Sequence, residues 1–291
     1  MPDQEIPRSL LFVPGNRPEL FAKAARSTAD TLVLDLEDGV PAAEKARAQE
    51  ATSEALAQWP DRLTLVRVRH PALGELHRDI AVLAPHTNQV VLLPKTESAA
   101  DVAAIDHALG AFEQRSGLAP DCVGVMVVIE SCAGLQALPS ILGSARRIRG
   151  ASLATAEEGD LMADLGGCWT PGGEALHYAR GKLVADTRAA RLPWLVDGPL
   201  MQFSDDQALR REAELARTFG FNGKVAIHPR QVATINDVFS PAPAQIERAE
   251  ALIAAYQAAR AAGHGVIKIQ GMMVDEANVR RAERLLARRP R

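Results

Sequence analysis

The sequence is poor in cysteine and has no long apolar run. Its three cysteines, Cys122, Cys132 and Cys168, are odd in number and lack CxxC spacing, so neither a disulfide framework nor a thiolate zinc site is expected. No stretch reaches the roughly 18 apolar residues that a membrane-spanning helix needs. The amino terminus is acidic and lacks an apolar signal core. We therefore expect a cytoplasmic protein with reduced thiols and no membrane partner.

An excess of charge of one sign is also missing. The chain has 33 Lys and Arg against 36 Asp and Glu, for a net charge of −3, and its basic residues are scattered. This pattern argues against a nucleic-acid-binding surface. At 291 residues the chain could form two domains, although α/β barrels of this size are commonly single domains.

Short apolar runs alternate with helical segments along most of the chain. Eight such runs are predicted to be strands, and they begin near residues 8, 31, 63, 89, 123, 148, 193 and 223. The fifth, Val123 to Ile129, is the most apolar and reads as a strand buried on both faces. Eight strands alternating with helices predict a (β/α)8 TIM barrel, and no Gly-rich phosphate loop supports the rival doubly wound sheet.

The carboxyl-terminal part lies outside this count. It has predicted helices over 244–262 and from Glu276 to about Arg288. We therefore divide the chain into a barrel over residues 1–240 and a helical extension over 241–291. The extension is either a lid or an arm that packs on a neighbouring subunit.

Polar residues follow the predicted strands, where the active face of such a barrel lies. They are Asp35, Glu37, Asp38, Arg67, Arg69, Lys95, Glu130, Glu157, Glu158, Asp160, Asp197 and His228. Oxygen ligands without histidine or thiolate clusters suit Mg²⁺, and arginine suits a substrate carboxylate. The set predicts a small substrate with a carboxylate beside a keto or hydroxy oxygen.

Each candidate also has a structural reading. Glu130 could be only a helix cap, and Asp160 could cap the helix that begins near Leu161. Asp35 could take part in catalysis or could hold Arg67 and nearby backbone in place. His228, which precedes Pro229, is expected to orient other groups.

Lys95 and Pro14 follow the fourth and first strands and complete the substrate-binding candidates. A desolvated barrel lysine can form an imine. Pairing of Lys95 with Glu97 or Glu130 is the favoured reading, because a lysine in such a place more often pairs with an acid.

Eight blocks in order resemble the citrate lyase beta-subunit family, which is related to malyl-CoA and citramalyl-CoA lyases. They start at Arg8, Asp35, Val66, Leu93, Ile129, Asp160, Gly223 and Gly271, and run from RSLLFVPGN to GMMVD. The resemblance implies a barrel that assembles as a homotrimer or hexamer, with Mg²⁺ held by Glu130 and Asp160. It also implies that Arg67 faces the substrate carboxylate and developing enolate. Asp275 would reach a neighbouring subunit's site for the acid/base step.

Two positions depart from the family pattern. Glu157 stands where relatives usually carry glycine, so Glu157 or Glu158 could replace or crowd Asp160 at the metal. The family's Arg-hydrophobic-Asn is Arg67-Val68-Arg69 here, and the second arginine could change which acid or acyl carrier is accepted.

The expected activity is metal-dependent cleavage of a 3-hydroxyacyl-CoA thioester to an acyl thioester and a 2-keto acid. The catalytic candidates are Arg67, Asp275 and Asp35. Two alternatives stay open. One is a metal-dependent aldolase acting on free hydroxy-keto acids. The other is a non-catalytic subunit that needs an acyl-carrier partner.

Overall fold

The computed structural model describes residues 6–261, 266–269 and 272–286. The chain divides into two compact units, Met1–Asn236 and Asp237–Arg291, and each is described by itself. No helix in the described ranges is long and apolar enough to cross a lipid bilayer.

The first unit is a closed barrel of eight parallel strands in which β8 pairs back onto β1. Its strands are β1 (Ser9–Pro14), β2 (Thr31–Asp35), β3 (Thr64–Arg67), β4 (Gln89–Leu93), β5 (Gly124–Ile129), β6 (Ile148–Leu153), β7 (Trp194–Asp197) and β8 (Gly223–Ala226). Every residue of β2, β4, β5 and β7 is buried, as expected for parallel strands covered on both faces. The predicted TIM barrel is confirmed.

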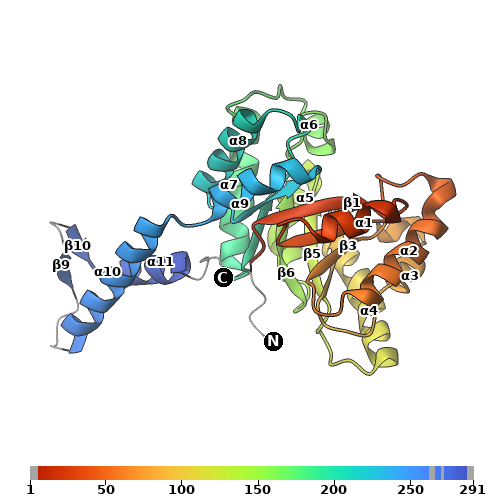
Figure 1. Ribbon diagram of the computed structural model, residues 1–291, viewed down its shortest axis with the longest axis horizontal. Coiled ribbons are helices and arrows are strands. Elements are labelled where there is room, and N and C mark those ends of the chain that lie inside the picture. Colours follow the sequence, from red (N-terminus) through yellow and green to blue (C-terminus); the bar gives the residue numbers. More distant parts are fainter. Residues whose placement is uncertain (1–5, 262–265, 270–271, 287–291) are drawn as a thin grey trace. The chain divides into compact units, whose positions relative to one another are not determined.

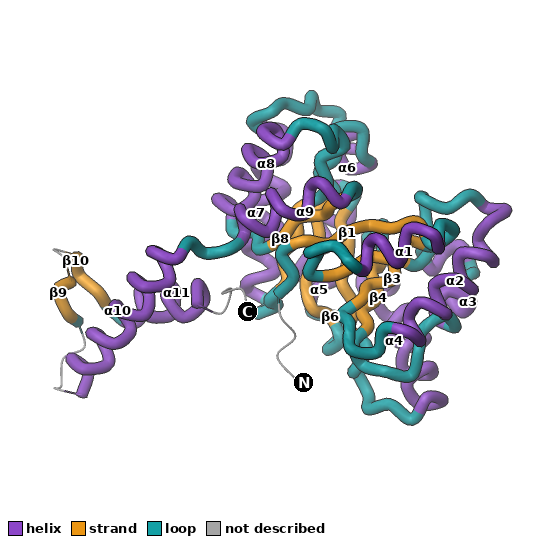
Figure 2. The backbone as a smooth tube through the Cα atoms, viewed as in Figure 1, coloured by secondary structure: helices purple, strands orange, loops and turns teal. Residues whose placement is uncertain are grey.

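Helices wrap the outside of the barrel, as Figures 1 and 2 show. They are α1 (Pro18–Ala25), α2 (Lys45–Gln58), α3 (Leu76–Ile80), α4 (Ala99–Ser116), α5 (Cys132–Leu142), α6 (Asp160–Leu165), α7 (His177–Ala189), α8 (Asp206–Phe219) and α9 (Pro229–Phe239). Three short 3-10 turns, η1 (Ala42–Glu44), η2 (Pro71–Leu73) and η3 (Glu174–Leu176), lie between them. Local side chains fix the helix starts: Ser98 and Asp101 form a capping box on α4, and Ser131 caps α5.

Apolar side chains fill the inside of the barrel. One buried cluster contains Leu10, Val33, Leu65, Val90, Leu92, Met126, Val128, Trp194, Val196 and Val225. Phe12 and Ile227 are partly buried and pack against this cluster. The interior is therefore a packed core, and the space for a ligand lies above it, at the carboxyl ends of the strands.

The second unit contains α10 (Pro243–Ala261), an antiparallel hairpin of β9 (Ile267–Ile269) and β10 (Met272–Val274), and α11 (Glu276–Leu286). Tyr256, Val274 and Val279 form a small apolar core of its own. The two helices of this unit match predicted segments, whereas the hairpin and α9 were not predicted. Gly271 of the predicted GMMVD block lies outside the described residues.

Candidate active site

Asp35 and Arg67 are paired at the ends of neighbouring strands, where β2 and β3 put them in register. The Nε and Nη2 groups of Arg67 donate to the two carboxylate oxygens of Asp35 at 2.7 and 2.8 Å. The same oxygens accept the backbone N–H groups of Glu37 and Gly39, each at 2.9 Å. A Cβ at position 39 would lie 2.3 Å from Asp35 Oδ2, so this turn requires glycine. Of its two predicted roles, the contacts of Asp35 support that of holding Arg67.

Two more groups fix the Arg67 guanidinium. Its Nη1 lies 3.1 Å from Glu37 Oε2, and its Cζ lies 5.1 Å from the centre of the Phe12 ring. Burial acts to lower the pKa of Arg67, but Asp35 and Glu37 outweigh it and keep that pKa above its ordinary value. Arg67 is therefore a fixed positive charge, held by neighbours on β1, on β2 and in the loop after β2. Glu37 was among the strand-end candidates but was given no role, and Phe12 was not a candidate, although both lie inside the blocks that begin at Asp35 and Arg8.

Glu130 follows β5 and points its carboxylate into the same mouth. Its Oε1 accepts the backbone N–H of Lys95 at 3.1 Å. Burial raises the pKa of Glu130 to about 7, and the charge of Glu37 adds to this effect, while Lys95 and Arg67 oppose it. The cap of α5 is Ser131, so the capping role considered for Glu130 is not observed.

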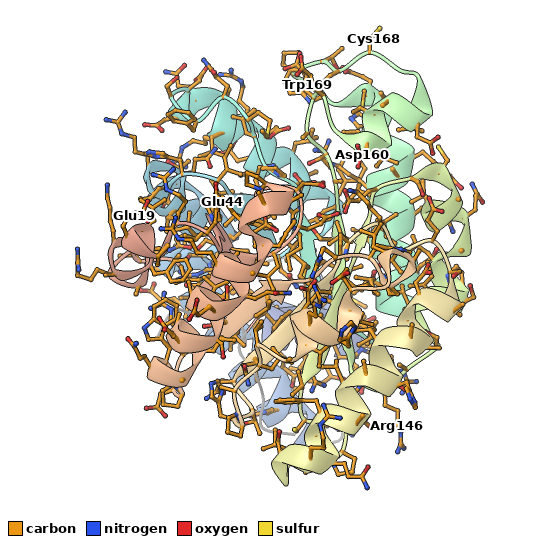
Figure 3. All side chains as sticks on the ribbon, turned by 90° about the vertical axis from the view of Figure 1, so that its right-hand side faces the viewer. Glu19, Glu44, Arg146, Asp160, Cys168 and Trp169 are labelled. Atoms are coloured by element: carbon orange, nitrogen blue, oxygen red, sulfur yellow. The ribbon has the colours of Figure 1, made fainter. Side chains whose placement is uncertain are left out.

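Asp160 is the first residue of α6, and Gly159 stands at the cap position with no side-chain hydrogen bond. The alternative reading of Asp160 as a helix cap is therefore wrong, and its predicted role at the metal stays a prediction. Its carboxylate is exposed. Figure 3 shows Asp160 nearer the middle of the barrel than the outer loop that carries Cys168 and Trp169.

Two cavities meet at these carboxylates. One, of about 500 Å³, lies above the barrel core and is lined by Phe12, Arg67, Glu130, Glu157, Glu158 and Asp160 with apolar strand residues. The other, of about 700 Å³, is lined by Lys45, Arg69 and Lys95, and shares Asp38, Glu130 and Asp160 with the first. Pro14, a predicted substrate-binding residue, lines neither of these two cavities.

The donor set fits Mg²⁺. Within the described residues no group of three or more His, Cys, Asp or Glu could hold a metal, but Mg²⁺ is commonly bound by one or two carboxylates, with substrate and water completing its shell. Burial raises the pKa of Glu130, and Lys95 and Arg67 offset this effect only in part, so a bound cation would stabilise its carboxylate. Asp160 is not engaged in a cap. Among the described residues that line the 500 Å³ cavity there is no His or Cys, which suits a hard cation.

Lys95 pairs with acids other than the predicted ones. Its Nζ lies 2.8 Å from Glu37 and 3.0 Å from Asp38. The predicted pairing of its ammonium with Glu97 or Glu130 is wrong, because Glu97 instead accepts from the Ser131 hydroxyl at 2.6 Å. Burial acts to lower the pKa of Lys95, but hydrogen bonds to Glu37 and Asp38 outweigh it and raise that pKa. A lysine held protonated in this way is poorly suited to imine formation.

Three other candidates are engaged elsewhere. Arg69 donates twice to the fully buried Asp79, at 3.0 and 2.7 Å, while still lining the 700 Å³ cavity. Asp197 is buried in an ion cluster with Arg180 and Lys224. His228 stacks on the Phe203 ring with 4.8 Å between ring centres.

Asp275 lies in the second unit, directly before α11. Its Oδ1 accepts the backbone N–H groups of Ala277 and Asn278 at 2.9 and 3.2 Å. Its local role is that of a helix cap, and the side chain is exposed.

Comparison with known proteins gives a consistent set of relatives. A model of the HpcH/HpaI aldolase/citrate lyase family matches residues 8–229. An L-malyl-CoA/beta-methylmalyl-CoA lyase of Cereibacter sphaeroides is 35% identical, over 95% of this chain and 92% of the relative. A citrate lyase subunit beta of Leuconostoc mesenteroides subsp. cremoris is 31% identical, over 98% and 94%. A crystal structure of CitE from Mycobacterium tuberculosis with magnesium, acetoacetate and coenzyme A is 30% identical, with TM-score 0.75 and 98% of each chain covered.

Proposed function

Because the chain belongs to the HpcH/HpaI aldolase/citrate lyase family, we propose that its barrel mouth reversibly cleaves a 3-hydroxyacyl-CoA thioester to an acyl-CoA and a 2-keto acid. The chain is an enzyme of the lyase class, with small-molecule substrates and Mg²⁺ as its cofactor. The observation that carries the specific proposal is the convergence of Arg67 and Glu130 on one cavity with an apolar floor.

Glu130 and Asp160 would hold the cation. When bound, Mg²⁺ supplies Lewis-acid polarisation of the hydroxy or keto oxygen and the adjacent carboxylate. Arg67, fixed by Asp35, Glu37 and Phe12, binds the substrate carboxylate and offsets the negative charge that develops on the enolate as the carbon–carbon bond breaks. The apolar wall of the cavity keeps water away from the developing carbanion.

Charge in the 500 Å³ cavity suggests which keto acid is used. Arg67 is the one basic residue in the described lining of this cavity, against five acidic ones, Asp38, Glu130, Glu157, Glu158 and Asp160. Lys95, in the adjoining cavity, is already held by two carboxylates. A second substrate carboxylate would therefore meet repulsion in the 500 Å³ cavity, because Arg67 already binds the first one. We propose that the keto acid carries a single carboxylate, as glyoxylate and pyruvate do.

A condensation assay tests this substrate class. Acetyl-CoA or propionyl-CoA is supplied with glyoxylate, pyruvate or oxaloacetate in Mg²⁺, and loss of the keto acid is followed. We expect kcat/KM for oxaloacetate to be about 100-fold below that for the best monocarboxylate. Equal use of oxaloacetate would contradict the charge argument. Turnover of free hydroxy-keto acids with indifference to CoA would move the function to the aldolase alternative.

The assembly is a separate proposal. We propose a homotrimer or hexamer in which Asp275, on the 241–291 extension beyond the 1–240 barrel, reaches the mouth of a neighbouring subunit and protonates the acyl carbon. The exposure of Asp275 and its place at the start of α11 are compatible with this role. We also propose a cytoplasmic location, because the three cysteines lack the spacing of a disulfide framework.

Mixing two inactive variants tests the shared site. Asp275→Asn and Arg67→Lys are each expected to lose most activity, because each removes one half of the machinery. Subunits exchanged between the two variants are expected to regain about a quarter of the activity per site, since some mouths then receive intact halves from both chains. Absence of any recovery after proven subunit exchange would place Asp275 outside a shared site.

A further inference from the structure

The turn after β4 holds a residue in an unusual backbone conformation. Lys95 has φ +49°, and only Asp121 and Arg191 share a positive φ among the described non-glycine residues. Side chains disfavour this left-handed region because Cβ crowds the backbone. The turn is locked by the next residue, since the Thr96 N–H donates to the Val128 carbonyl at 3.1 Å and the Thr96 hydroxyl donates to Leu93 at 3.0 Å. Backbone strain of this kind persists only where the surrounding structure holds it, and it is concentrated at functional sites.

The main chain of this turn reaches Glu130. The Lys95 N–H donates to Glu130 Oε1 at 3.1 Å, and no other described hydrogen bond fixes that carboxylate. The neighbouring chain also packs tightly here, because a Cβ on Gly134 of α5 would lie 2.4 Å from the Thr96 carbonyl oxygen. The orientation of the Glu130 carboxylate therefore depends on the backbone conformation at position 95.

The side chain of the same residue reaches toward Arg67. Its ammonium binds Glu37 Oε1 at 2.8 Å, and the other oxygen of Glu37 lies 3.1 Å from Arg67 Nη1. Glu37 is buried, so removal of Lys95 would leave its Oε1 atom without a cationic partner. The Lys95 ammonium thus restrains Glu37, and Glu37 restrains one arm of the guanidinium.

We propose that Lys95 is a positioning residue with two separable functions: its backbone N–H sets the cation-binding carboxylate of Glu130, and its ammonium, through Glu37, sets Arg67 for the keto acid. This inference rests on the proposed function for the identity of the two ligands. It differs from direct substrate binding by Lys95, because the ammonium is occupied by Glu37 and Asp38.

Substitutions at position 95 separate the two functions. Lys95→Gly removes the ammonium but favours positive φ, Lys95→Val removes it and disfavours positive φ, and Lys95→Arg keeps the cation. Arg191→Gly is the matched control, because Arg191 has φ +59° and is exposed on the turn after α7, away from the mouth. It reports what relief of backbone strain does by itself. Thermal melting and circular dichroism of each variant establish that it is folded.

Binding of Mn²⁺, followed by electron paramagnetic resonance, reports on Glu130 without need of activity. We expect Lys95→Gly, Lys95→Arg and Arg191→Gly to bind Mn²⁺ within about twofold of wild type, and Lys95→Val to bind it about 10- to 100-fold more weakly. We expect KM for the keto acid to rise about tenfold in Lys95→Gly and to recover in Lys95→Arg.

Wild-type Mn²⁺ affinity in folded Lys95→Val, or a large loss in Lys95→Gly, would overturn the backbone function. An unchanged KM in Lys95→Gly would overturn the side-chain function. A KM that stays about tenfold raised in Lys95→Arg would overturn the side-chain function as well. If the Mn²⁺ pattern holds while no thioester is cleaved by wild type, the positioning of Glu130 stands and the proposed function falls.

Discussion

Replacement of Glu130 by glutamine is expected to weaken binding of divalent cations at least about 100-fold and to lower kcat/KM for cleavage at least about 10³-fold. Glutamine keeps the shape of the side chain and an oxygen that can accept the Lys95 N–H. It removes the negative charge, which a hard cation needs in a ligand. The loss should therefore appear in cation affinity and in rate, and not in folding.

Asp160→Asn and Glu158→Gln extend this comparison. Asp160 is free of a capping bond and lines both cavities, whereas Glu158 lines only the 500 Å³ cavity of the two. We expect a loss of cation affinity in Asp160→Asn and little change in Glu158→Gln. The reverse result would make Glu158 the second ligand. Glu214→Gln, an exposed glutamate on α8, is the control for general charge loss.

The raised pKa of Glu130 gives the cation site a pH dependence. Its pKa of about 7 lies above the ordinary glutamate value of 4.5. Between these two pH values the folded, cation-free protein therefore keeps a proton that the unfolded chain has lost. By linkage, stability of the cation-free protein should fall as pH rises through this window, because the unfolded chain binds fewer protons there. Cation affinity should rise with pH up to about 7 and then level off. Glu130→Gln should lose both effects.

Replacement of Arg67 by lysine is expected to lower kcat/KM by about 10²- to 10³-fold with cation affinity nearly unchanged. Lysine retains the charge but cannot donate to both carboxylate oxygens of Asp35 while it keeps the ion pair with Glu37. The charge would then no longer be aimed at the substrate. The rate of thioester cleavage and Mn²⁺ affinity, measured on the same preparation, separate this effect from one on the cation site.

Arg69→Lys is the matched control for Arg67→Lys. Arg69 also clamps a buried carboxylate, that of Asp79, close to the end of the same strand. Both variants should lose thermal stability, because each weakens the pairing of a buried aspartate. Only Arg67→Lys should lose most of its activity. An equal loss in Arg69→Lys would indicate that Arg69 takes the substrate carboxylate, and the account of Arg67 would fail.

The barrel was predictable because parallel strands buried on both faces leave short, dense apolar runs in the sequence. For this reason the fourth strand was predicted to begin near residue 89, and it is observed over Gln89–Leu93. Strand ends then located Arg67 and Glu130, since all eight strands open on the same face. α9 was missed although Val232, Ile235 and Phe239 are buried on one side at helical spacing, because no helix was assigned between the eighth strand and residue 244.

Contacts between loops could not be predicted in the same way. Lys95 was paired with acids close in sequence or at the next strand end, whereas its partners Glu37 and Asp38 come from the loop after β2. The left-handed backbone at Lys95 directs its N–H to Glu130, and its ammonium binds Glu37 and Asp38. The backbone conformation of a non-glycine residue leaves no mark on a single sequence. A capping role stayed open for Asp160 beside its predicted role at the metal, because sequence alone does not distinguish a cap from a first helical residue.

The central claim is that cleavage depends on a divalent cation held by Glu130. The most direct test is a Mn²⁺ titration of metal-stripped wild type and Glu130→Gln, with bound cation and release of 2-keto acid from citramalyl-CoA and malyl-CoA measured in the same samples. We predict that keto acid release by wild type is absent at first and rises in proportion to bound Mn²⁺, and that Glu130→Gln neither binds the cation in this range nor releases product. Full cleavage by wild type before any cation is bound, or wild-type Mn²⁺ affinity in Glu130→Gln, would contradict the claim.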